Sequence, residues 1–428
     1  DDALECSNEV LKINRSSHDV VWEGWVLNEL DRMDEAKNHY DEAIKISPDS
    51  EEGYRYMGWI LMDEKKWTKA IEYLKKACDK TTENVDEEDL VEFNRAKKRL
   101  NNTRLYEGRA LKLLGLEQSD IAAMTEKMKE AEAIFDSILD ARELAEVADR
   151  VAGEAMMEKG NCNWNLEKYN VAEDCYLAAS EMIPTNAKVW YHLGDLRINE
   201  DSASDALMFY DKSLLCDKTS ANIPAYDGKG DAHRISKEWT KAIECYDQIL
   251  NYSDKHHKAF YRKALSYQGM KEYTTAVTHF ASFIDKFPKN RWIVRAHANK
   301  AYSEIEIAFG GDRKKFEDAL ETCKKGIAIS VKYDESFANS DITLETGYGA
   351  LTKDELDKRK LSDIEYLFEE KGVALTELEQ YLDAVNCFKK LLKDTKDDRF
   401  FLERIIHCLG KLGKIDEQKE YRRKLDHL

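Results

Sequence analysis

Residues 17–50 read SHDVVWEGWVLNELDRMDEAKNHYDEAIKISPDS, and residues 51–84 read EEGYRYMGWILMDEKKWTKAIEYLKKACDKTTEN. When the two segments are aligned, Ala36 falls on Ala70, which is 34 residues further along the chain. The same alanine recurs at Ala172, Ala206, Ala242, Ala276, Ala319 and Ala384. A period near 34 residues with almost no strand signal is typical of a solenoid of helix-turn-helix repeats, whose neighbouring units bury each other's apolar faces.

The other recurring positions have physical reasons. With Ala36 counted as position twenty, Gly24 stands at position eight, and both small residues let the paired helices approach closely. Aromatic residues at positions four and twenty-four, such as Tyr40, fill the space on either side. Proline at position thirty-two ends the second helix, because proline cannot continue one. Pro48, Pro184 and Pro288 occupy this position, and Pro224 falls at the start of a first helix, where it is tolerated.

This pattern resembles the tetratricopeptide repeat, in which an aromatic, Leu, Gly, Tyr, Ala, a second aromatic, Ala and Pro stand at these offsets. Seven units of the chain match it well. The resemblance implies an all-α fold, a right-handed α-solenoid of about ten helix-turn-helix repeats. It also implies that the first helix of each unit lines the concave side, with positions two, five, nine and twelve facing inward.

We expect one superhelix over residues 1–428. Its expected parts are a half repeat (1–16), two repeats (17–50 and 51–84), divergent helical repeats (85–152), four repeats (153–186, 187–220, 223–256 and 257–290), a repeat with a lengthened first helix (291–333), an irregular insertion (334–364), a repeat (365–398) and C-terminal capping helices (399–428). The half repeat indicates either a fragment of a longer chain or an N-terminal cap.

Two stretches depart from the pattern. Residues 85–152 lack the alanine and aromatic signature but keep apolar residues at helical spacing, which predicts lengthened helices and not a mobile linker. The second stretch covers roughly residues 298–364, and within it residues 338–352 are the most loop-like part of the chain. Thr352 and Glu355 then resemble a capping box that opens a long helix.

Charge and cysteine usage restrict the partners and the compartment. A net charge of −18 disfavours duplex nucleic acid or an anionic membrane as a partner. The charge is either a solubility coat or a field that favours a basic partner. The nine cysteines form no CxxC and no zinc spacing, and Cys175, Cys245 and Cys387 share one repeat position. We expect buried thiols without disulfides, which indicates a reducing, cytoplasmic compartment.

No pattern in the chain predicts catalysis. HExxH and GxxxxGK[ST] are absent from the sequence. Gly310–Asp312 reads as a lone turn, and His256 and His257 read as a solvated repeat junction without ligands nearby. We therefore expect no enzymatic activity, no catalytic residue, no metal site and no cofactor.

The resemblance implies a set of residues on the inner wall of the groove. They are Trp25, Arg55, Trp59, Met157, Trp164, Tyr191, Asp195, Asp231, Lys258, Tyr261, Leu265, Trp292, Arg295 and Asn299. Aromatic side chains outside the packing signature indicate a binding surface, unless closure of the superhelix buries them. Because none of these positions carries the signature, we expect that truncating Trp292 weakens binding and leaves the melting temperature unchanged.

Within the family, one branch holds the C-terminal carboxylate of heat-shock chaperones with a clamp of two Lys, two Asn and one Arg. Lys258 and Arg262 match the last pair, whereas Tyr191, Asp195 and Gly228 replace the other three. An acid where a carboxylate would have to bind argues against that ligand. Together with Arg295, the two matching cations are expected to form a basic spot that pairs with acidic side chains of a different peptide.

These observations predict a non-enzymatic scaffold or adaptor that holds a peptide or partner protein in its concave groove. A second hypothesis, motivated by the half repeat, is a substrate-recruiting or regulatory region whose catalytic domain lies outside this sequence. A third is self-association, since the unlike ends of an open array can stack head to tail.

Overall fold

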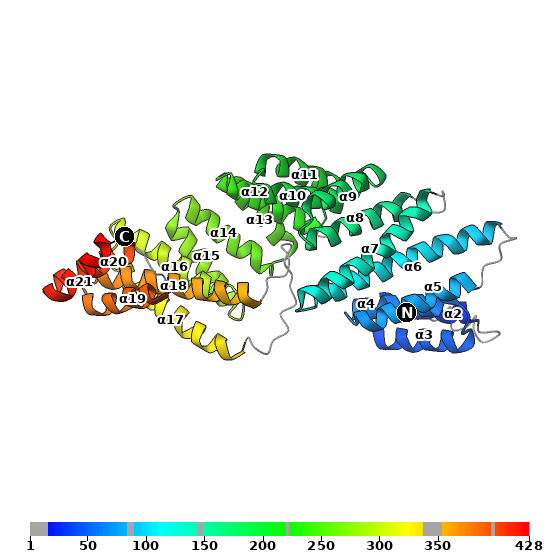
Figure 1. Ribbon diagram of the computed structural model, residues 1–428, viewed down its shortest axis with the longest axis horizontal. Helices are drawn as coiled ribbons and strands as arrows, with labels where there is room; N and C mark the ends of the chain where they lie inside the picture. The colour runs from blue at the N-terminus through cyan, green and yellow to red at the C-terminus, as the bar shows by residue number, and fades with distance from the viewer. Residues whose placement is uncertain are drawn as a thin grey trace. The chain divides into compact units, whose positions relative to one another are not determined.

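A computed structural model describes residues 16–83, 90–143, 149–219, 222–336, 353–394 and 399–427. In these ranges the chain is entirely helical, with no strand (Figure 1). The helices are α2 (Ser17–Glu29), α3 (Met33–Ile46), α4 (Glu51–Asp63), α5 (Trp67–Glu83), α6 (Leu90–Leu116), α7 (Ile121–Glu143), α8 (Asp149–Asn165), α9 (Tyr169–Met182), α10 (Ala187–Asn199), α11 (Ala203–Cys216), α12 (Ile223–Ile235), α13 (Trp239–Tyr252), α14 (His257–Gly269), α15 (Tyr273–Lys286), α16 (Ile293–Phe309), α17 (Lys315–Ser336), α18 (Lys353–Glu377), α19 (Tyr381–Asp394), α20 (Arg399–Lys411) and α21 (Ile415–Asp426). The predicted all-α fold of helix pairs is confirmed.

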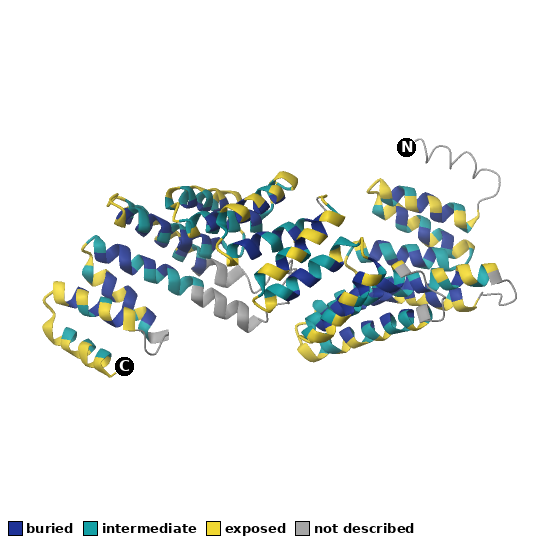
Figure 2. Ribbon diagram, turned by 90° about the horizontal axis from the view of Figure 1, so that it is seen from above, coloured by how far each residue is buried: buried dark blue, intermediate teal, exposed yellow. Residues whose placement is uncertain are grey.

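The contacts divide the chain into two compact units. The first unit holds residues 1–200 and 215–217, and the second holds residues 201–214 and 218–428. In the first unit each helix packs against the next from α2 to α10, and in the second unit the same holds from α12 to α21. Buried residues lie along the faces where neighbouring helices meet (Figure 2). None of the described helices is long and apolar enough to cross a bilayer.

The recurring positions form the core, as predicted. All eight recurring alanines are fully buried, and so are the residues four positions later, which are aromatic except for Leu74 and Cys323. A Cβ atom added to Gly24 would lie 2.6 Å from Cε1 of Tyr40, and one added to Gly230 would lie 2.6 Å from Cε1 of Tyr246. Glycine at position eight is therefore needed because the aromatic ring of the second helix rests on its backbone.

Residues 85–152 correct one expectation, because the signature is present there. In α6 and α7, a Cβ atom on Gly108 would lie 2.5 Å from Cε1 of Phe135, and Ala131 is fully buried. This is the contact that Gly24 makes with Tyr40, but the two residues are 27 positions apart instead of 16. The difference of 11 residues is about three helical turns, which preserves the facing sides of both helices. Because α6 and α7 are longer than α2 and α3, the signature residues lie further apart in the sequence than the usual spacing.

The remaining irregular stretch lies partly outside the described residues. As predicted, the first helix of the 291–333 segment is long, since α16 runs from Ile293 to Phe309 and ends at Gly310. Helix α17 continues to Ser336, and α18 begins at Lys353. Three predictions fall outside the described residues. They are the half repeat (except Ser16), the loop-like residues 338–352, and Thr352 of the expected capping box.

Cysteine side chains behave as small apolar residues. Cys78, Cys162, Cys175, Cys245, Cys323, Cys387 and Cys408 are buried and free of disulfides, whereas Cys216 is exposed. Burial raises the pKa of the Cys245 thiol to about 11. A thiol with so high a pKa is a poor nucleophile, which agrees with a structural role.

Seven of the turns between paired helices use a left-handed residue that is not glycine. Positive φ angles near 60° occur at Asp31, Lys65, Glu167, Asp201, Lys237, Lys271 and Glu379. At Lys65 the next amide, that of Lys66, donates to the carbonyl oxygen of Leu61 at 2.8 Å, and the amide of Lys65 donates to that of Met62 at 2.9 Å. These bonds form the Schellman motif, in which glycine is the usual left-handed residue. Each such turn therefore carries some backbone strain.

We expect Lys65→Gly to raise the free energy of unfolding by about 0.5 kcal/mol or slightly more. Glycine removes the cost of about 1 kcal/mol for a left-handed L-residue, and part of that gain is offset by the greater freedom of glycine in the unfolded chain. Urea denaturation followed by circular dichroism measures the change. Lys69→Gly, four residues later inside α5, is the matched control and should cost about 1 kcal/mol. Equal losses for both variants would contradict the proposed strain.

Candidate binding surface

The residues predicted for the inner wall lie on first helices of both units. In the first unit they lie on α2, α4, α8 and α10, and in the second unit they lie on α12, α14 and α16. Trp292 is the residue that caps the N-terminus of α16.

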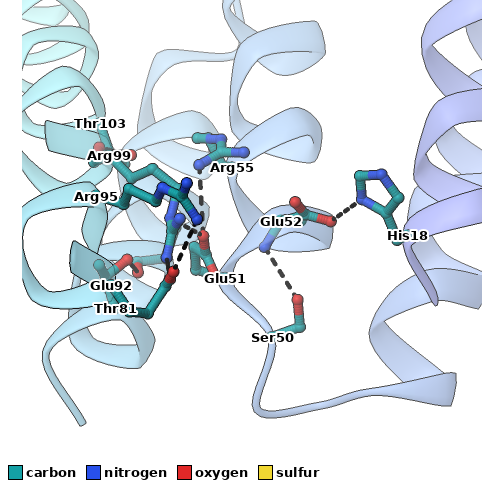
Figure 3. A network of polar contacts seen from close by, with 11 residues as sticks. His18, Ser50, Glu51, Glu52, Arg55, Thr81, Glu92, Arg95, Arg99 and Thr103 are labelled. Carbon is teal, nitrogen blue, oxygen red and sulfur yellow. Dashed lines mark hydrogen bonds and ion pairs between the residues drawn. The ribbon is translucent and has the colours of Figure 1, made fainter. Parts of the chain in front are cut away.

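Arg55 is committed to contacts within the first unit. Its side chain is buried on α4, where Nη1 lies 3.6 Å from Oε1 of Glu51 (Figure 3). Arg99 on α6 forms an ion pair with the same carboxylate, with its Nε 2.9 Å from Oε1 of Glu51. The Arg55 guanidinium also lies over the rings of Tyr56 and Trp59, 5.4 and 5.7 Å from their centroids. These contacts correct the expectation of a groove-facing cation at position five of α4.

Trp25 and Trp59 meet at one pocket of the first unit. The pocket has a volume of about 270 Å³ and lies among α2, α3, α4 and α6. Its lining residues are Trp25, Asn28, Glu29, Tyr40, Tyr56, Trp59, Ile60, Met62, Asp63 and Tyr106. We call it the aromatic pocket. Trp59 packs between Tyr56 and Tyr106, with both pairs of ring centroids 4.9 Å apart.

Trp25 stands at the outer wall of the aromatic pocket. It is 37% exposed, and its ring stacks at 4.7 Å on that of Trp22, which is 52% exposed. Trp22 does not line the pocket, although it lies on the same helix. Trp25 thus presents an exposed aromatic surface at the edge of a cavity, which is the arrangement expected of a protein-binding site.

The predicted residues on α8 and α10 have different surroundings. Met157 is buried and lines a charged cavity of about 400 Å³, where Arg109 pairs with Glu154 at 2.9 Å and with Glu158 at 2.8 Å. Trp164 makes an edge contact with Tyr169, with ring centroids 5.2 Å apart. Tyr191 and Asp195 are half-buried on α10.

In the second unit, the predicted basic spot is neutralised by buried acids. Nη1 of Arg262 lies 2.7 Å from Oδ1 of Asp227 and 2.5 Å from Oδ2 of Asp231. Lys258 pairs with the other oxygen of Asp227. The hydroxyl of Tyr246 donates to Asp231 at 2.9 Å. Both aspartates are buried. These contacts correct the expectation of a basic spot, because Lys258 and Arg262 belong to an internal ion network between α12 and α14.

Burial by itself would raise the pKa of Asp227, but the positive charges of Arg262 and Lys258 lower it below its usual range. The carboxylate is thus held ionised in the interior. Arg295, the third predicted cation, pairs at 2.5 Å with Asp363 of α18. All three cations of the expected basic spot therefore have acidic partners within the chain.

The aromatic anchors predicted in the second unit belong to its core. Tyr261 is 8% exposed, and its hydroxyl accepts a hydrogen bond of 2.8 Å from the amide of Asn299. Trp292 is half-buried, and its ring centroid lies 5.2 Å from that of Tyr261. Leu265 packs on the same cluster. The premise that truncation of Trp292 leaves stability unchanged is therefore wrong, because the indole covers the core.

The comparisons with known proteins agree with this geometry. A family model described as tetratricopeptide repeat matches residues 21–50 and 153–186, and a second model with the same description matches residues 258–290. These segments hold the pairs α2–α3, α8–α9 and α14–α15, in which the buried alanine and aromatic positions recur. The chain is a tetratricopeptide-repeat protein.

Solved structures are similar to this tetratricopeptide-repeat protein in fold. The apo form of RapI is 14% identical and aligns over 87% of this chain and 96% of its own, with a TM-score of 0.54. MamA is 20% identical over 45% of this chain and 98% of its own, with a TM-score of 0.37. Yeast Tom70 is 14% identical over 99% and 88%, with a TM-score of 0.38. Comparison with curated protein sequences gives no match.

Several residues of these tetratricopeptide repeats were not predicted from the sequence. Asp227 stands at position five of its unit, one of the positions considered, and the pair with Lys258 could have been inferred from the opposite charges. Tyr106 lies in the stretch without the usual spacing, and Asp63 lies beyond position twelve. Nothing in the sequence indicated that Tyr106 and Asp63 line the pocket, because the residues that they meet there come from other helices.

Proposed function

We propose that this protein is a non-enzymatic interaction scaffold that holds a peptide or partner protein on the face formed by its first helices. Tetratricopeptide repeats are in general protein-interaction modules, and this supports the class of function. The observation that carries the specific proposal is the aromatic pocket, where Trp25 and Trp59 from positions nine of two successive units line one cavity. The seven buried free thiols among the described residues support a reducing, cytoplasmic compartment.

The second-unit residues contribute to this proposal in a different way. Lys258, Arg262 and Arg295 already have acidic partners, and Tyr261 is buried. A peptide that used them would have to displace ion pairs that the fold already contains, at a considerable desolvation cost. The proposed docking face is therefore centred on α2 and α4 in the first unit.

Selection of displayed random peptides on the immobilised full chain tests the proposal. We expect an enriched sequence motif whose binding weakens at least tenfold with Trp25→Ala, because truncating an aromatic anchor costs about 2 kcal/mol. Trp22→Ala is the matched control: it removes the more exposed indole of the same stacked pair, which does not line the pocket. Failure to enrich any motif, or equal losses for both variants, would refute the proposal.

A further inference from the structure

The acidic residues of the aromatic pocket have an unusual placement. Glu29 and Asp63 are the last residues of α2 and α4, and neither helix has a basic residue in its last turn. The carbonyl end of a helix carries partial negative charge, so a carboxylate there is unfavourable and a cation is favourable. The pocket therefore collects two carboxylates and two negative helix ends on one side.

No cation among the described residues forms an ion pair with these two carboxylates. Glu29 and Asp63 are the only lining residues with charged side chains at neutral pH, and none of the ion pairs within the described ranges includes either of them. Burial raises the pKa of Asp63, and no neighbouring positive charge opposes this effect. The nearby Lys37 is already bound to Asp34 and Glu64.

The pocket wall also contains polar atoms whose hydrogen-bonding capacity is unused. Oδ1 of Asn28 and Nε1 of Trp59 are buried, and neither has a hydrogen-bond partner. Buried polar atoms of this kind are costly unless a ligand or water satisfies them. The amide oxygen can accept from a cationic group, and the indole N–H can donate to a peptide carbonyl.

The aromatic rings complete the environment for a cation. The face of a tryptophan or tyrosine ring attracts a guanidinium or ammonium group within about 6 Å of its centroid. Trp59 and Tyr106 already hold internal cations in this way, Arg55 at 5.7 Å and Arg109 at 5.5 Å, and neither of those arginines lines the pocket. The rings of Trp25, Tyr56 and Trp59 can surround a guest in the cavity.

We infer that the aromatic pocket receives an arginine or lysine side chain from a basic segment of the partner, with Glu29 and Asp63 as its counter-charges. This inference rests on the proposed function and names the chemistry of its ligand. The net charge of −18 would attract such a segment at long range and raise its association rate at low salt.

Single-residue probes test the pocket directly. The full chain is labelled with 5-fluorotryptophan, its ¹⁹F signals are assigned with Trp25→Phe and Trp59→Phe, and N-acetyl-arginine methylamide is titrated at constant ionic strength. We expect saturable shifts of the Trp25 and Trp59 signals. The citrulline analogue, which has the same shape without the charge, should bind at least tenfold more weakly. Equal binding of the two probes, or absence of a saturable shift, would overturn the inference.

Charge variants separate the pocket from the general field of the protein. Glu29→Gln and Asp63→Asn should each weaken arginine binding about fivefold, since each removes a counter-charge. Glu72→Gln on α5 removes the same charge from an exposed residue that does not line the pocket, and it should change binding less than twofold. Equal weakening by all three variants would show a non-specific field and overturn the site.

The two experiments fail independently. Suppose that the selected peptide motif depends on Trp25 but contains no basic residue, and that the arginine probe causes no saturable shift. The scaffold function would then be supported and the basic-residue pocket overturned. Saturable arginine binding without any selected motif would retain the pocket and refute the scaffold.

Discussion

Asp227→Ala should lower the free energy of unfolding by about 3–5 kcal/mol, the largest loss we expect from a single charged residue. The substitution leaves Lys258 and Arg262 without the carboxylate that both contact, in a place where Asp227 itself is only 8% exposed. Arg262 keeps Asp231 as a partner, whereas Lys258 forms no other ion pair with the residues that the structure describes. Urea denaturation at pH 7, followed by circular dichroism, measures the loss.

Asp247→Ala is the matched control for this prediction. Asp247 also forms an ion pair with a lysine, Lys263, at 2.5 Å, but its side chain is 44% exposed. An exposed pair of this kind contributes about 0–1 kcal/mol, because water screens it. If both substitutions cost the same small amount, the Asp227 network is not a structural element, and the groove interpretation of Lys258 and Arg262 regains support.

Glu370→Gln should stabilise the protein by about 4–5 kcal/mol at pH 8.5 and change its stability little near pH 4.5. Glu370 is 5% exposed on α18, and burial, with the nearby charges of Glu369 and Glu306, raises its pKa to about 8. Between pH 4.5 and 8 the unfolded chain releases this proton while the folded chain keeps it. The folded state then binds more protons, so stability falls as pH rises through this window.

Glutamine removes that loss because it stays neutral at every pH. Each pKa unit corresponds to about 1.4 kcal/mol, which sets the scale of the gain. Denaturation of both proteins across pH 4.5–8.5 gives the difference at each pH. Glu365→Gln, on the same helix and half-buried, should change stability by less than about 0.5 kcal/mol. A constant difference between wild type and Glu370→Gln over the whole range would contradict the prediction.

The surroundings of the candidate binding residues were the least predictable part of the molecule. Positions two, five, nine and twelve fall on the first helices, but a position within a helix does not state which side chains the neighbouring helices place against it. Trp25 and Trp59 share an open pocket, while Tyr261 at a comparable inward position is buried against Phe283 and Trp292. The difference depends on the side chains that neighbouring helices contribute.

The sequence by itself determined the helix pairs and their internal packing. Ala36 and its equivalents, Gly24 and Tyr40 contact one another within a single unit, so a 34-residue period is sufficient to specify them. Only the tertiary structure decided the pairing of Gly108 with Phe135, the ion network of Asp227, and the pocket among α2, α4 and α6. These features join residues from helices of altered length or from different units. Their distances depend on how helices stack, which no local period encodes.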